Sequence, residues 1–323
     1  MSVSHAEQVD THPGIPNGWF AVGWSRDLEH GDVRRLKAFD RELALFRTRS
    51  GEAKLIDAYC PHLGAHLAEG GRVVGENLRC PFHGWTFDGD GRCVEIPYCQ
   101  RIPTRARVRS YPVRERNHMI MAWHHAEEKP PSFEVPAISA LDDPEWSEPR
   151  RFELEVPVHM QDMAENNCDP VHFQFVHGML ETPPTQFELG SEPHFFRVSG
   201  VSKRETPWGE FEIDLVRESH GIGMVTVEAK GMPGAGLLMV SSTTPIDAHH
   251  THSRWVLTST RNIVDLAGAE WFAALEAGVM QDMRIWKNKI HRADPVLCEA
   301  DEHLAAFRRW TRQWYSRPQP EAR

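Results

Sequence analysis

The pattern of hydrophobic and polar positions divides the chain into two regions of different character. In residues 18–126, short apolar runs alternate with clusters of glycine, aspartate and asparagine, which is typical of strands separated by turns. The strand-like segments of this region are residues 33–39, 43–49, 53–58 and 119–123. The pattern therefore predicts a small all-β domain in this part of the chain.

A proline-rich and acidic stretch follows at residues 127–149 and contains the pair Pro130-Pro131. Segments of this composition are typical of connections between domains. We therefore predict a connector here and a second domain over residues 150–316. The residues after 316 are expected to form a loose tail.

The second region mixes strand-like and helical patterns. Residues 152–158 resemble a strand, and residues 161–178 have helical character. Strand-like runs alternate with Gly/Pro turns over residues 195–262, which suggests an antiparallel sheet. Residues 267–291 form the clearest predicted helix, because apolar residues recur there at spacings of three and four. The members of this stripe are Trp271, Leu275, Val279, Met283, Trp286 and Ile290.

Composition narrows the class of protein further. The chain has 323 residues and a formal net charge of −10, which argues against nucleic acid as the main partner. No apolar stretch approaches the roughly 18 residues that a membrane-spanning helix needs. Residues 1–13 are polar and lack the apolar core of a signal peptide, so we expect a cytoplasmic protein.

Six cysteines are present, and two of them stand in an organised pattern with histidines. Cys60 and His62 are followed by Cys80 and His83, in the spacing C-x-H-x17-C-x2-H. A [2Fe–2S] centre with cysteine ligands on one iron and histidine ligands on the other needs this set of donors. A structural Cys2His2 zinc site is the alternative, but zinc fingers usually pair cysteine with cysteine and histidine with histidine. The other cysteines are expected to be buried or half-buried free thiols, and they are Cys93, Cys99, Cys168 and Cys298.

A second candidate metal site follows in the pattern D-x2-H-x4-H, formed by Asp169, His172 and His177. Two imidazoles and one carboxylate make the facial triad of non-haem Fe(II) oxygenases, although both histidines could also be ordinary core residues. On an ideal helix the two histidines would point about 140° apart, so we expect the helix to bend or end between them.

The carboxylate of this triad is expected to be Asp282, which falls inside the apolar stripe of the predicted helix 267–291. A buried carboxylate needs a metal or a cationic partner, so a structural ion pair is the alternative. Glu276 falls on the polar side of the helix and is the weaker candidate.

With both motifs in place, residues 18–126 resemble the Rieske domain of the ring-hydroxylating oxygenase superfamily. The resemblance implies that Cys60 and Cys80 hold one iron of the cluster, that His62 and His83 hold the other, and that His66 does not ligate. It also implies an α+β fold, in which the all-β domain precedes a helix-grip-type catalytic domain with an antiparallel sheet and a long C-terminal helix.

For the second site, the resemblance implies a mononuclear Fe(II) held by His172, His177 and Asp282. It further suggests that Asp169 bridges a ligand histidine to His83 of a neighbouring subunit in a homotrimer, whereas a helix-capping role is the alternative. Electrons from NAD(P)H would arrive through a ferredoxin or a flavin/iron–sulfur reductase.

Residues 281–289, 294–297 and 308–310 resemble the oxygenase component of bacterial 3-ketosteroid 9α-hydroxylase, although that enzyme has a longer C-terminal segment. This implies an O2-dependent monooxygenase that acts on a small hydrophobic, steroid-like polycyclic substrate. Pocket residues would come from residues 180–260. An aromatic-ring dihydroxylase or an O/N-demethylase of the same superfamily is the alternative. An alternative of another class is a Rieske electron-transfer protein without oxygenase activity.

Two further features are interpreted as structural. The histidine-rich residues 249–252 are expected to form an exposed loop rather than a metal site. The arginine-rich residues 101–116 could dock an acidic electron-transfer partner, but we interpret them as a solvated strand face.

Overall fold

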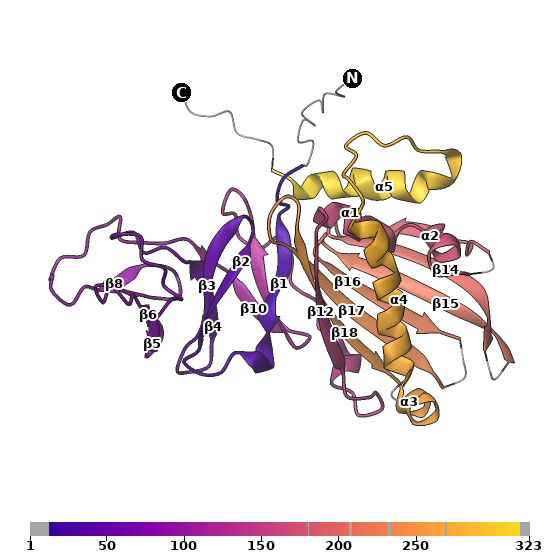
Figure 1. The fold of residues 1–323 in the computed structure, drawn as a ribbon, viewed down its shortest axis with the longest axis horizontal. Coiled ribbons are helices and arrows are strands. Elements are labelled where there is room, and N and C mark those ends of the chain that lie inside the picture. Colours follow the sequence, from indigo (N-terminus) through magenta and orange to yellow (C-terminus); the bar gives the residue numbers. More distant parts are fainter. Residues whose placement is uncertain (1–12, 180, 207–208, 232–233, 269, 317–323) are drawn as a thin grey trace, which may run out of the picture.

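The computed structural model describes residues 13–179, 181–206, 209–231, 234–268 and 270–316 (Figure 1). The tail predicted after residue 316 lies outside these residues. Within the described part of the chain, no helix is long and apolar enough to cross a membrane.

The N-terminal region consists of small antiparallel sheets, as predicted. The first has the order β1-β11-β10, formed by Gly18–Trp24, Met119–His124 and Val113–Arg116. The second has the order β2-β3-β4-β9, formed by Val33–Ala38, Arg41–Arg47, Ala53–Asp57 and Ser110–Tyr111. The third has the order β5-β6-β7-β8, formed by Arg72–Val74, Asn77–Arg79, Thr86–Phe87 and Cys93–Glu95.

The predicted strands of this region are confirmed, but their ends are shifted by one or two residues, most of all in β3, which spans Arg41–Arg47 instead of 43–49. Phe39, expected to end a strand, forms a two-residue turn with Asp40, and both have positive φ angles (58° and 56°). Such a tight turn matches the twist of a hairpin, so β3 begins directly after it, at Arg41.

The C-terminal region contains a seven-stranded antiparallel sheet in the order β12-β18-β17-β16-β15-β14-β13. In that order its strands are Arg150–Val156, Thr251–Ser259, Gly236–Pro245, Met224–Lys230, Gly209–His220, Phe195–Thr206 and Gln186–Leu189. The predicted strand at 152–158 and the antiparallel sheet over 195–262 are therefore confirmed.

Alternate residues of these strands point to opposite faces of the sheet, and each face carries buried side chains. On one face, Val240 and Val256 belong to a buried cluster with Trp19 and Met121 of the N-terminal domain. On the other face, Trp255 packs with α4. Hydrogen bonds reinforce the contact between the domains, because the backbone of Ala21 in β1 bonds the side chains of Ser242 and Thr244 in β17, and these residues are buried.

The described α-helices are α1 (Met160–Ala164), α2 (His172–Phe175), α3 (Arg261–Ala267), α4 (Glu270–Trp286) and α5 (Glu302–Thr311). Short 3-10 helices are η1 (Ser25–Asp27), η2 (Ser139–Leu141), η3 (Glu165–Asn167), η4 (Glu299–Asp301) and η5 (Arg312–Trp314). Figure 1 shows α4 crossing the face of the large sheet and α5 lying at one end of it.

The helix predicted over residues 267–291 is shorter than expected. It begins after Gly268, whose left-handed φ of 67° ends α3, and it stops at Trp286. Ile290 therefore lies outside the helix and is 50% exposed, so the last position of the predicted stripe is wrong. The stripe itself is confirmed at Val279, Met283 and Trp286, which are buried.

The free thiols are confirmed, but their predicted burial is only half right. Cys93 and Cys168 are buried, whereas Cys99 and Cys298 are exposed. The last two lie in segments without regular structure, where no neighbouring element covers them.

The two segments interpreted as structural also differ in part from expectation. His249 and His250 are exposed in the turn before β18, but His252 lies in β18 and contacts Glu153 at 3.1 Å. Of the arginine-rich segment, only Arg114 and Arg116 lie on a strand, and both are exposed, while residues 101–109 form a loop.

Candidate metal centres

Two loops of the N-terminal domain, residues 60–65 and 80–85, repeat one hydrogen-bond pattern. In each loop the cysteine N–H donates to the carbonyl oxygen five residues later (2.9 and 2.7 Å). A glycine N–H donates back to the cysteine carbonyl (2.9 and 3.2 Å). These glycines, Gly64 and Gly84, have φ angles of 74° and 76°, a conformation that favours glycine. The repeated sequence Cys-Pro-x-x-Gly thus folds twice into the same loop.

The two loops bring the four predicted cluster donors together. Cys60 and Cys80 are buried, and the rings of His62 and His83 lie 4.7 Å apart between centroids. Trp85 stacks on His62 with an interplanar angle of 6°, which fixes that ring. His62 Nδ1 is buried without a hydrogen-bond partner among the described residues.

This arrangement fits a bound [2Fe–2S] group. An unsatisfied buried nitrogen is costly, and a metal bond would satisfy it. Burial raises the pKa of Cys60 to about 11, and the neighbouring Cys80 adds to the effect. A thiol in this environment becomes a thiolate when a metal ion supplies the compensating charge.

The second set of donors begins in the segment after β12. Helical structure is interrupted here, because η3 ends at Asn167 and α2 starts only at His172. Asp169 Oδ1 accepts the backbone N–H groups of Val171 at 2.8 Å and of His172 at 3.4 Å, in the turn that precedes α2. His177 follows the end of α2, so the predicted break between the two histidines is confirmed.

The break and α4 together bring His172, His177 and Asp282 into one group. Their potential ligand atoms all lie within 4.8 Å of one another. His177 Nε2 is 3.5 Å from Asp282 Oδ2, and the Asp282 side chain is only 10% exposed. Glu276 is exposed on α4 and does not belong to this group. Two imidazoles and one carboxylate on one side leave positions open, as a non-haem Fe(II) site requires.

A hydrogen bond on the side away from the donor group orients the His177 ring. Gln281 Oε1 lies 2.8 Å from His177 Nδ1, so this nitrogen donates its proton and Nε2 is left to face Asp282. Asp169 Oδ2 lies 3.6 Å from His172 Nδ1. The sequence pattern placed Gln281 on the polar side of its helix and missed this contact. The only signal in the sequence was its position next to Asp282.

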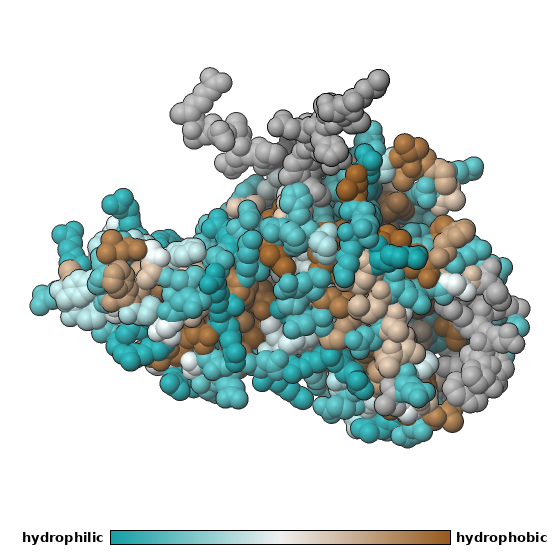
Figure 2. Space-filling model, viewed as in Figure 1, coloured by the Kyte–Doolittle hydropathy of each residue, from teal (hydrophilic) through white to brown (hydrophobic). Residues whose placement is uncertain are grey.

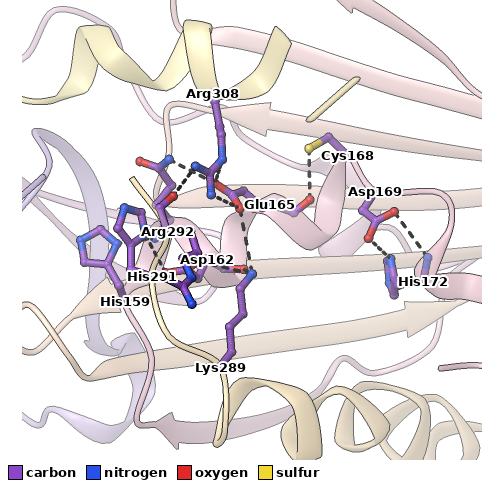
Figure 3. A network of polar contacts seen from close by, with 11 residues as sticks. His159, Asp162, Glu165, Cys168, Asp169, His172, Lys289, His291, Arg292 and Arg308 are labelled. Carbon is purple, nitrogen blue, oxygen red and sulfur yellow. Dashed lines mark hydrogen bonds and ion pairs between the residues drawn. The ribbon is translucent and has the colours of Figure 1, made fainter. Parts of the chain in front are cut away.

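The ligand-bearing segment is anchored by two buried acids, Asp162 and Glu165 (Figure 3). Asp162 pairs with His291 Nδ1 at 2.9 Å and with Lys289 Nζ at 3.4 Å. Glu165 pairs with Arg308 Nε at 2.8 Å. Residues 289–308 therefore hold α1 and η3 in place.

Asp162 also forms a group of possible metal donors with His159 and His291. However, His159 Nδ1 accepts a hydrogen bond from the backbone of Gln161, and Lys289 already supplies a positive charge to Asp162. This cluster is therefore satisfied as an ion pair, as buried charges require.

A cavity of about 410 Å³ opens beside the triad and has the size of a small-molecule site. Its wall is largely apolar and comes from the large sheet and the helices facing it. The larger apolar side chains are Met163, Phe173, Leu215, Ile222, Val225, Val227, Met239, Trp255, Leu275, Val279 and Trp286. Sequence reasoning placed the pocket in residues 180–260 and thus missed the wall formed by α1, α2 and α4.

Both regions of the chain match known families. Residues 18–112 match the family described as Rieske [2Fe-2S] domain. Residues 122–315 match the family described as 3-Ketosteroid 9alpha-hydroxylase C-terminal domain.

Curated relatives include both desaturases and monooxygenases. Cholesterol 7-desaturase nvd 1 of Ciona intestinalis is 34% identical, over 96% of this chain and 71% of that protein. A probable 3-ketosteroid-9-alpha-monooxygenase oxygenase component of Rhodococcus rhodochrous is 32% identical, over 92% of this chain and 79% of that protein.

Solved structures share the fold. Pseudomonas putida CBB5 NdmA with caffeine superimposes with a TM-score of 0.75 at 22% identity, over 91% of this chain and 89% of that one. Dicamba monooxygenase bound to 3,6-dichlorosalicylic acid gives a TM-score of 0.76 at 20% identity, over 93% of this chain and 97% of that one.

Proposed function

This chain belongs to the Rieske oxygenases with a 3-ketosteroid 9alpha-hydroxylase C-terminal domain, and from that premise we propose that it is the oxygenase component of a multicomponent monooxygenase acting on a steroid-like substrate. The observation that carries the proposal is the convergence of His172, His177 and Asp282 on the wall of a largely apolar cavity. An electron carrier would need neither this triad nor the cavity.

In this proposal, the iron–sulfur cluster and the mononuclear iron are bound by separate sets of residues. Cys60, Cys80, His62 and His83 hold the [2Fe–2S] cluster, and His172, His177 and Asp282 hold the mononuclear iron. When bound, the cluster supplies single electrons originating from NAD(P)H through a reductase, and the iron activates O2.

The chain's own side chains position the substrate and the ligands. Gln281 accepts the Nδ1 proton of His177 and so keeps Nε2 directed at the metal position. Asp169 Oδ2 lies 3.6 Å from Nδ1 of His172, which is longer than a hydrogen bond. The apolar walls of the cavity exclude water and favour a hydrophobic ring system beside the triad.

The curated relatives favour desaturation as a second candidate reaction. The cholesterol 7-desaturases match almost the whole chain with an identity similar to that of the monooxygenases. Both reactions begin at a C–H bond of a polycyclic substrate, so the same cavity would serve either.

A single-turnover assay distinguishes these outcomes. The iron-replete protein is reduced chemically, freed of reductant, and exposed to O2 with a panel of 3-ketosteroids and sterols. Mass spectrometry then reads one added oxygen atom for hydroxylation or two fewer hydrogens for desaturation. Oxidation of the cluster without any steroid or sterol product would refute the substrate class.

Assembly into a homotrimer is part of the proposal. Figure 1 places β5–β8, with the cluster loops beside them, at the opposite end of the molecule from α2 and α4. Exposed apolar side chains, including Leu63 (64% exposed) and Phe82 (60%), lie in those loops, and Figure 2 shows hydrophobic surface (brown) at that end. The Asp169 side chain is 38% exposed. These features suit contact between Asp169 and His83 of a second copy.

A further inference from the structure

Arg217 is a buried arginine whose side chain lines the same cavity as the triad. It lies on β15 and is only 4% exposed. Its Nε and Nη1 atoms have no hydrogen-bond partner among the described residues, and no described carboxylate lies within ion-pair distance of it. The guanidinium carbon lies 5.1 Å from the centre of the Phe173 ring, so the side chain is held in place by packing.

Two other buried arginines show how this protein satisfies a guanidinium elsewhere. Arg47 makes five hydrogen bonds, two of them to the carboxylate of Glu115 at 2.8 and 2.7 Å. Arg254 donates to the Ala21 carbonyl at 2.7 Å and lies 3.3 Å from a carboxylate oxygen of Glu153. Arg217 differs from these two, because its Nε and Nη1 have no hydrogen-bond partner in the described part of the chain.

The acidic groups near Arg217 are engaged with other partners. Asp169 accepts the backbone N–H of Val171 and faces His172. Burial raises the pKa of Cys168 well above its usual value, so its thiol carries no charge at neutral pH. Burial also lowers the pKa of Arg217 to about 10, which still leaves it protonated. The cavity therefore contains a positive charge without a hydrogen-bonded counterion from the described residues.

We propose that Arg217 binds a carboxylate carried by the polycyclic substrate, so that this enzyme selects acids over neutral relatives. A buried charge is costly unless it is paired, and a guanidinium donates charge-assisted hydrogen bonds to a carboxylate. The apolar body of the substrate would then lie against Val227, Met239 and Trp255. The inference rests on the proposed function only in taking this cavity as the substrate site.

The test compares acids with their own primary amides. Binding to the holoenzyme is measured anaerobically by calorimetry for a 3-ketosteroid with a side-chain carboxylate, for phenanthrene carboxylic acid, and for the amide of each. We expect each acid to bind at least about 30-fold more tightly than its amide, because the amide leaves the guanidinium charge unpaired. Arg217→Met should abolish this preference, and Arg217→Lys should retain part of it.

Arg254→Met is the matched control, because it removes a buried guanidinium outside the cavity and should leave the preference intact. The measured quantity is the ratio of acid affinity to amide affinity. A variant that is merely less stable should bind both ligands more weakly and leave this ratio unchanged. If Arg217→Met fails to fold, the wild-type ratio and its reduction in Arg217→Lys decide the question.

The possible outcomes separate this inference from the proposed function. Equal binding of acids and amides, no binding of either acid, or an unchanged preference in Arg217→Met would overturn the role of Arg217. An acid preference that depends on Arg217, without oxidation of any steroid, would support Arg217 and refute the steroid assignment.

Discussion

At the scale of single residues, the second site depends on which nitrogen of His177 faces Asp282. Gln281 settles this by accepting the proton on Nδ1 at 2.8 Å. Gln281→Leu removes the acceptor while keeping a similar volume. We expect the affinity for Fe(II) to fall about 10- to 100-fold, as is usual when a residue supporting a metal ligand is lost.

Iron content after dialysis against graded chelator concentrations measures this effect, while the visible spectrum reports the cluster separately. Glu276→Gln is the control, because Glu276 is exposed on the same helix and outside the donor group. An unchanged iron affinity in Gln281→Leu would show that the contact does not orient His177.

A single residue, Asp162, is also expected to make the stability of the fold depend on pH. Burial alone would raise the pKa of Asp162, but the hydrogen bond from His291 and the charges of Lys289 and His291 outweigh it and lower the pKa below its usual 3.8. A lowered folded-state pKa stabilises the fold above the unfolded-state value, and this stability is lost as the pH falls through the folded-state pKa. We therefore expect stability to decline below about pH 4.

Asp162→Asn should lower the free energy of unfolding at pH 7 by about 3 to 5 kcal/mol, because it removes the buried carboxylate that pairs with Lys289 and His291. It should also weaken the acid dependence. Asp142→Asn is the control, since Asp142 pairs with His118 at 3.3 Å but is 84% exposed. Urea unfolding at pH 7 and pH 3.5 measures the free energy of unfolding and its acid dependence. Equal losses of unfolding free energy in Asp162→Asn and Asp142→Asn would contradict the role of Asp162.

At the scale of elements, α4 connects stability with the site. Its buried face packs on Trp255 of the sheet and carries Asp282 in the same stripe. Two methionines on this helix make a matched pair, because Met283 is buried (7% exposed) and Met280 is largely exposed (42%). Neither lines the cavity.

Met283→Ala should cost about 2 to 5 kcal/mol of unfolding free energy, through lost burial and a cavity that the packing cannot fill. Met280→Ala should change it by no more than about 0.5 kcal/mol. Denaturation followed by tryptophan fluorescence measures the difference. Similar values for the two variants would mean that α4 does not dock through this face.

At the scale of the whole molecule, the two proposed metal sites lie towards opposite ends of one chain (Figure 1). Electron transfer between copies predicts that two inactive variants rescue one another when co-expressed. Asp282→Ala keeps the cluster donors, and His83→Ala keeps the triad. Their mixed oligomers should turn over substrate, although each variant alone should not.

Adding Asp169→Ala to the His83→Ala chain should abolish the rescue, because this chain supplies the working triad. Adding the same change to the Asp282→Ala chain should leave the rescue intact. Product yield per iron measures the outcome. Absence of rescue in soluble mixed oligomers would remove the contact between copies from the proposal.

Much of this organisation could be predicted from local patterns in the sequence. Cys-Pro-x-x-Gly fixes a loop by itself, because its hydrogen bonds and positive-φ glycine lie within six residues. The stripe of α4 likewise follows from a repeat along one helix, and it indicated that Asp282 would be buried.

Only the tertiary structure decided the features that join distant segments. Three features depend on which elements meet across the sheet: the wall formed by α1, α2 and α4, the anchoring of Glu165 by Arg308, and the burial of Arg217. A single arginine in a strand carries no local signal of its environment. Its burial is set by residues far away in the chain, and only the packed fold reveals it.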